Sequence, residues 1–160
     1  MIPSEKAYLF FKSKIIAVVG ISLNKPGPAN LVYDLFKQSN LPVFGISKSL
    51  SEYKNDTMYP SLSALPQIPE AVFIALNKNS TLKLTAECID LGVNIIWLHD
   101  MMGTCVKKRN SVSSVNEEAV LLAEKNSIQV IAGSCPMQFL QTDLFHLCLN
   151  KVNLWTGRIK

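Results

Sequence analysis

The sequence is short of charge and lacks the patterns that mark a membrane-spanning, secreted or disordered chain. Only 18% of its 160 residues are charged and 48% are hydrophobic, a composition that excludes a disordered tail or linker. No apolar run approaches the roughly 20 residues that cross a bilayer. The first residues also lack the basic and long apolar segments of a signal peptide. We therefore expect a cytoplasmic protein that does not act at a membrane.

The cysteines lack the spacing of a metal site or a disulfide framework. Cys88, Cys105, Cys135 and Cys148 include no C-x-x-C pair, and no clustered histidines accompany them. We therefore expect neither a bound metal ion nor a structural disulfide.

The sequence also lacks a concentration of positive charge. Its 16 basic and 12 acidic residues give a net charge of +4, and the basic residues are scattered except at residues 107–109. Nucleic-acid binders gather Lys and Arg on one face, whereas an anionic small molecule needs only a few well-placed cations. We therefore expect a small-molecule ligand rather than nucleic acid. The sequence does not indicate an oligomeric state.

Five short apolar runs alternate with stretches of helical spacing. Runs that are apolar throughout are typical of parallel strands buried on both faces. Their alternation with helices predicts an α/β, three-layer Rossmann-like fold with a parallel five-stranded sheet in the order 3-2-1-4-5. We expect one domain over residues 1–160, with a core of about residues 14–136 and a helical tail over residues 137–160. The expected strands are residues 15–19, 43–46, 71–76, 93–98 and 128–132, and residues 57–60 are at most a brief extended piece.

The first run ends at Gly20, and a polar loop with a second glycine, Gly27, leads to a helix expected from residue 29. A strand, a glycine turn and a helix in succession aim backbone N–H groups at one spot, as in phosphate sites. The two glycines are seven residues apart, which is not the G-x-G-x-x-G pattern of NAD sites. The longer loop can wrap a diphosphate, with the Ser22 hydroxyl and the Lys25 ammonium as donors. An ordinary connecting loop is the alternative.

The end of the second run lacks the acid that NAD sites use. An Asp or Glu at this position bonds the ribose hydroxyls, whereas this chain has Ser47, Lys48 and Ser49. A cation among hydroxyls suits a phosphate on the ribose, which indicates NADP or coenzyme A. The alternative is that Lys48 is a solvated loop lysine.

The ends of the other expected strands add candidates, because ligands of such folds bind at the carboxyl edge of the sheet. Asn77 and Lys78 follow the third strand and can contact a sugar or phosphate, although Asn77 can equally cap the next helix. Trp97 and His99 share a face at the end of the fourth strand. We expect Trp97 to pack in the core more readily than to stack on a ligand, while His99 can act as an acid or base. Cys135 follows the fifth strand and is either a reactive thiol or a small buried residue at a tight turn.

In the order and spacing of these features, the sequence resembles the small single-domain CoA-binding domain proteins. These are Rossmann-like relatives of the CoA-binding domain of succinyl-CoA synthetase α subunits. The resemblance covers about residues 14–136 and implies coenzyme A or an acyl-CoA along the carboxyl edge of the sheet. It is carried by residues 17–22, residues 59–62, Gly92, residues 96–98, and Cys135 with Pro136.

The resemblance also implies roles for particular positions. After the second strand the family usually reads Val-Asn-Pro, and this chain reads Ile46, Ser47 and Lys48. The loop over residues 99–112 is longer than is usual in the family, which often has Gln in place of His99. The family's phosphate-facing loop corresponds here to Gly20, Ile21, Ser22, Asn24 and Lys25.

Three functional hypotheses follow. The first is a non-catalytic CoA-binding module, such as a sensor or carrier, since the family supplies no settled catalytic residues. The second is an NADP-dependent or thiol-using enzyme built on Lys48, His99 and Cys135. The third is a scaffold that has lost its ligand and acts through partners.

Overall fold

The computed structural model describes residues 3–100, 113–140 and 151. Several features of the sequence lie outside the described residues: the basic residues 107–109, Cys105, Cys148 and the expected tail helix beyond residue 140. Within the described ranges, no helix is long and apolar enough to cross a membrane. In the same ranges, no group of His, Cys, Asp and Glu side chains is placed to hold a metal ion.

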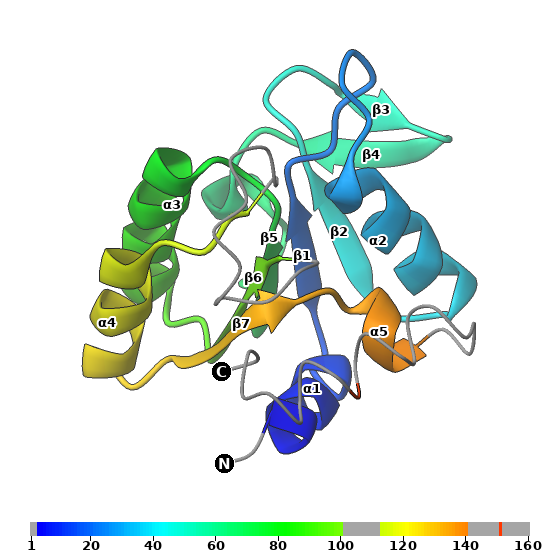
Figure 1. The fold of residues 1–160 in the computed structure, drawn as a ribbon. Coiled ribbons are helices and arrows are strands. Elements are labelled where there is room, and N and C mark those ends of the chain that lie inside the picture. Colours follow the sequence, from blue (N-terminus) through cyan, green and yellow to red (C-terminus); the bar gives the residue numbers. More distant parts are fainter. Residues whose placement is uncertain (1–2, 101–112, 141–150, 152–160) are drawn as a thin grey trace.

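The centre of the molecule is a seven-stranded sheet in the order β3-β4-β2-β1-β5-β6-β7 (Figure 1). Neighbouring strands pair in parallel except β3 and β4, which are antiparallel. The parallel strands therefore present their carboxyl ends along one edge of the sheet. The strands are β1 (Ile16–Val19), β2 (Val43–Ile46), β3 (Glu52–Tyr53), β4 (Asp56–Tyr59), β5 (Ala71–Ile74), β6 (Ile95–His99) and β7 (Gln129–Ser134).

Helices cover both faces of the sheet, so the fold has three layers (Figure 1). Val18 and Phe73 pack into the cluster that includes α1 and α2, whereas Ala17 and Val72 pack into the cluster that includes α3 and α4. This division follows from strand alternation, which sends successive side chains to opposite faces. The helices are α1 (Pro3–Phe11), α2 (Pro28–Gln38), α3 (Lys78–Leu91), α4 (Glu117–Lys125) and α5 (Met137–Leu140), with a 3-10 turn η1 (Leu62–Ala64).

The α/β Rossmann-like class expected from the sequence is confirmed, but the sheet has seven strands rather than five. The additional parallel strand is β4, which lies beside β2. The expected order placed the run at residues 71–76 there; that run forms β5 and pairs with β1 instead. When β4 is counted, the six parallel strands follow the order 3-2-1-4-5-6. The position expected for the run at residues 71–76 was therefore wrong because the extended piece expected at residues 57–60 was not counted as a strand of the sheet.

The strand β4 is hard to recognise because it is short and mostly polar. Met58 is its only fully buried residue, and only Met58 and Tyr59 pair with β2. Gly45 leaves room for the Met58 thioether, the flexible end of a side chain that could shift if a Cβ were present. With one buried residue and two paired ones, β4 has no hydrophobic period that would mark it as part of the sheet.

Candidate functional site

Gly20 begins the loop between β1 and α2, residues 20–27, which we call the β1–α2 loop. Its φ of +114° is a conformation that side chains other than glycine adopt only under strain. A Cβ at Gly20 would also lie 2.5 Å from the carbonyl oxygen of Ala75, a backbone atom that cannot move aside. The loop therefore passes directly against the chain that leaves β5, and only glycine fits there.

Asn30, in the first turn of α2, holds the two ends of the β1–α2 loop together. Its side chain is 4% exposed, and its Oδ1 accepts hydrogen bonds from the N–H groups of Ser22 and Gly27, each at 3.3 Å. Its Nδ2 donates to the Ser22 carbonyl at 3.1 Å. The Ser22 hydroxyl in turn accepts from the Lys25 N–H at 3.3 Å. The loop is thus fixed before any ligand arrives.

Asn30 is not among the residues that the sequence patterns indicated as ligand contacts. The available signal was a polar residue three positions after Gly27, the N-cap of α2, which is the spacing of a capping interaction. The side chain reaches back to the Gly27 N–H as such an interaction requires.

The outer part of the loop leaves donors open. The side chains of Asn24 and Lys25 are exposed. In the described part of the chain, the N–H groups of Leu23, Asn24 and Ala29 make no hydrogen bond. They lie around the start of α2, where the helix dipole favours negative charge. This geometry can receive an anion.

Ser47, directly after β2, is buried and bonds the β1–α2 loop through its side chain. Its hydroxyl donates to the Ile21 carbonyl at 2.7 Å, and its N–H donates to the Tyr59 carbonyl at 2.9 Å. Ile21 is itself 2% exposed and packs in the core. Ser47 and Ile21 therefore position the loop, while the neighbouring Lys48 is exposed at the same edge.

Asn77 and Lys78 stand at the start of α3. The Asn77 side chain is the helix cap, because its Oδ1 accepts from the Ser80 N–H at 3.0 Å. The Lys78 carbonyl accepts from the side chain of Asn116, which also caps α4 through the Ala119 N–H. One side chain thus ties the beginnings of two helices together. The Lys78 side chain itself is exposed.

Trp97 lies in the core and does not line the edge of the sheet. Its ring is fully buried, with centroids 5.2 Å from Phe10 and 5.4 Å from Phe139. Its Nε1 donates to the Ser134 carbonyl at 3.1 Å. The ring therefore anchors α1 and α5 to one face of the sheet.

His99 and Cys135 are both buried at the ends of β6 and β7. Burial lowers the pKa of His99 to about 4, although the charge of Asp100 opposes the shift. Burial raises the pKa of the Cys135 thiol to about 12, against a weaker opposing hydrogen bond from Met137. At neutral pH His99 is therefore an uncharged imidazole, and Cys135 carries a thiol rather than a thiolate.

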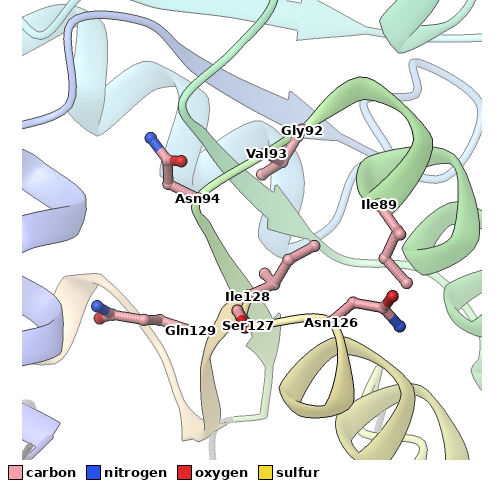
Figure 2. Close-up of a pocket in the computed structure, with 8 residues that line it drawn as sticks. All are labelled: Ile89, Gly92, Val93, Asn94, Asn126, Ser127, Ile128 and Gln129. Carbon is pink, nitrogen blue, oxygen red and sulfur yellow. The ribbon is translucent and has the colours of Figure 1, made fainter.

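A cavity of about 460 Å³ lies at the opposite edge of the sheet, where the chain enters β6 and β7 (Figure 2). The ends of α3 and α4 border it. It is separate from every residue that the sequence indicated as a ligand contact. Its lining consists of Ile89, Gly92, Val93, Asn94, Asn126, Ser127, Ile128 and Gln129.

The structure thus brings some of the candidates together and separates others. Hydrogen bonds connect the start of the β1–α2 loop, Gly20 to Ser22, to its surroundings: Ser47 bonds Ile21, and Asn30 bonds Ser22. His99 ends β6, two strands from β1 in the sheet. With strands about 4.8 Å apart, this separation is roughly 10 Å.

A family model described as "CoA binding domain" matches residues 14–141 of the chain. No curated protein matches the sequence.

Solved structures share the fold. A protein from Pyrococcus horikoshii OT3 has a TM-score of 0.71 at 20% identity, over 88% of this chain and 92% of its own. A protein from Thermus thermophilus has a TM-score of 0.68 at 18% identity, over 84% and 93%. A dinucleotide-forming acetyl-coenzyme A synthetase from Ca. Korarchaeum cryptofilum has a TM-score of 0.61 at 21% identity. That match covers 77% of this chain but only 26% of the synthetase.

Proposed function

Because the chain belongs to the CoA binding domain family, we propose that it binds coenzyme A or an acyl-CoA along the carboxyl edge of the sheet. The observation that carries the proposal is the β1–α2 loop. Asn30 fixes the loop at both ends, while open N–H groups gather at the start of α2. This arrangement suits the diphosphate of the cofactor.

The two exposed lysines beside this loop suit the remaining phosphate. Lys25 is on the loop and Lys48 follows β2. Neither of them forms an ion pair within the described residues, whereas Lys37 and Lys54 do. Coenzyme A carries a phosphate on its ribose, and the segment after β2 has no acid to repel it. NADP shares this feature and is the competing ligand.

We favour a binding role without catalysis, such as a sensor or carrier. The groups that a thiol-using enzyme would need are Cys135 and His99, and burial keeps both uncharged at neutral pH. A thiolate is the reactive form of cysteine. These observations support a module whose output is the bound state itself.

Calorimetry and thermal unfolding with CoA, acetyl-CoA, NADP, NAD and ATP test the proposal. At 100 times its dissociation constant a ligand stabilises the fold by about 2.7 kcal/mol. We expect that effect for CoA and acetyl-CoA. Stabilisation by NADP without any effect of CoA would overturn the proposal.

Lysine variants test the assignment of residues. Replacing both Lys25→Ala and Lys48→Ala is expected to weaken CoA binding about tenfold and to reduce its salt dependence. Lys83→Ala is the matched control, since Lys83 is an exposed lysine on α3. Equal affinities for the double variant and the control would show that the ribose phosphate lies elsewhere.

A further inference from the structure

Three side chains at the carboxyl ends of β6 and β7 have buried polar atoms with no hydrogen-bond partner. The atoms are Nδ1 of His99 and the hydroxyl oxygens of Ser114 and Ser134, as found among the residues that the structure describes. His99 is 2% exposed, and the two serines are 0% exposed. We call these three residues the edge cluster.

The members of the edge cluster are neighbours through their backbones. Ser134 of β7 pairs with His99 of β6, after a β-bulge that shifts the register between Leu98 and His99. The Ser114 N–H donates to the His99 carbonyl at 2.9 Å. The Ser134 carbonyl accepts from the Asp100 N–H at 3.1 Å and from the Trp97 indole. These backbone bonds are thus made, while Nδ1 of His99 and the two serine hydroxyl oxygens have no partner among the described residues.

Unused polar atoms in a protein interior are costly, and most buried polar groups find a partner. Alanine or valine at these positions would avoid the cost, because none of the backbone bonds needs a hydroxyl or an imidazole. Three such groups on backbone segments that bond to one another therefore indicate a partner that the described residues do not supply. The edge of the sheet at which they lie is the one that receives ligands in this class of fold.

We propose that the edge cluster receives the acyl end of an acyl-CoA and selects acyl groups that carry a neutral oxygen, a hydroxyl or a ketone, near the thioester. This inference rests on the proposed binding of CoA at the β1–α2 loop. The end of β6 lies two strands from β1, roughly 10 Å away, and the pantetheine arm of the cofactor is longer than that.

The chemistry of the cluster favours a neutral oxygen over a carboxylate or a plain hydrocarbon. The hydroxyls of Ser114 and Ser134 can each donate and accept, and Nδ1 of a neutral imidazole does one or the other according to the tautomer. Burial keeps His99 uncharged, and the carboxyl of Asp100 follows directly, so an anionic acyl group gains no cationic partner from this pair. The Phe73 ring, 5.8 Å from that of His99, offers an apolar wall for the carbon chain. A hydrocarbon acyl group would leave the polar atoms unpaired.

Calorimetry of the full chain with butyryl-CoA and 3-hydroxybutyryl-CoA tests the inference, because these thioesters differ by one hydroxyl. We expect the hydroxy compound to bind at least about tenfold more tightly. Unsubstituted CoA is the reference that reports the β1–α2 loop alone. Equal affinity for the two thioesters, with CoA bound, would overturn the inference and leave the proposed function intact. Absence of CoA binding would overturn both.

Serine variants separate ligand recognition from a structural role. In the double variant Ser114→Ala with Ser134→Ala, we expect the preference for 3-hydroxybutyryl-CoA over butyryl-CoA to fall to about twofold or less. The affinity for CoA itself should be unchanged. The melting temperature of the free protein should rise or stay constant, since unpaired groups are removed. Ser4→Ala, at an exposed position on α1, is the matched control. A lower melting temperature with an unchanged preference would show that the hydroxyls are structural.

Discussion

The β1–α2 loop and the edge cluster lie on the same edge of the sheet but treat their polar groups in opposite ways. In the loop, Asn30 and Ser47 use their side chains to bond backbone atoms of neighbouring segments. In the edge cluster, Nδ1 of His99 and the hydroxyl oxygen of Ser134 have no partner among the described residues. The side chains that hold the loop are therefore bonded in the free protein, and the loop leaves outer backbone N–H groups open, whereas the cluster leaves side-chain atoms open. A site can thus combine a preorganised end with a selective end.

The strongest test of the preorganised end is Gly20→Ala. The change places a Cβ 2.5 Å from the Ala75 carbonyl at a φ of +114°. We expect a loss of about 2–4 kcal/mol of unfolding free energy, from the collision and the strain together. Urea denaturation measures it, and CoA affinity should fall with it.

Gly92→Ala is the control for Gly20→Ala. Gly92 also has a positive φ, +74°, but an added Cβ would meet nothing within 4 Å. We expect a cost of about 1–2 kcal/mol from backbone strain alone, with CoA affinity preserved. If both variants lose the same stability, the close contact over Ala75 is not what fixes the loop.

The next largest effect is expected for Asn30→Ala. The variant loses three hydrogen bonds of a buried side chain, two at 3.3 Å and one at 3.1 Å. We expect a loss of about 2–3 kcal/mol, since the Ser22 and Gly27 backbone groups lose their partners. Asn126→Ala, which removes one exposed hydrogen bond to Leu122, should cost less than about 0.5 kcal/mol. A stable Asn30→Ala protein with full CoA affinity would remove the distinction between the two regions.

Ser47→Ala and Ser134→Ala compare the regions with the same chemical change. Ser47→Ala leaves the buried Ile21 carbonyl without its 2.7 Å donor, so we expect a loss of about 1 kcal/mol. Ser134→Ala removes a hydroxyl without a partner and should not lower stability. Thermal unfolding of both variants measures the contrast, and a similar loss in the two would contradict it.

The smallest effect concerns pH. The pKa of His99 is lowered from 6.5 to about 4 in the folded state, so the unfolded chain binds the proton more readily. Stability is therefore present above pH 6.5 and is lost as pH falls toward 4. Between pH 7.5 and 5.5 this residue should contribute a loss of about 1 kcal/mol. His99→Gln should remove that part of the pH dependence, and an unchanged slope would show that the imidazole is not neutral and buried.

The parts of the fold that follow from local sequence were predictable. The five apolar runs became β1, β2, β5, β6 and β7, since an unbroken apolar run is itself the mark of a central parallel strand. The extended piece expected at residues 57–60 overlaps β4, but its place beside β2 was not predictable, because only Met58 and Tyr59 pair with that strand.

The places of the candidate residues at the ends of the strands were predictable, but the contacts of their side chains were not. Ser47 lies at the expected edge, yet its hydroxyl faces the Ile21 carbonyl, and only the three-dimensional packing shows this direction. Trp97 follows the expected alternation and is buried under α1. Asn30 went unnoticed because its three bonds connect segments that the sequence separates by up to eight residues. Binding of CoA by the individual side chains stays a prediction.

The two outer strands of the sheet, β3 and β7, are the places where the sheet of a second molecule could pair with this one. At one end β3 is only two residues long, and Lys54 beside it forms an ion pair with Asp34 of α2. At the other end Lys6 of α1 donates to the Val130 carbonyl of β7 at 2.8 Å. Short edge strands and lysines at the border oppose strand-by-strand addition of a second sheet. The helix α1, which covers Trp97 through Phe10, therefore also opposes edge-to-edge aggregation through Lys6.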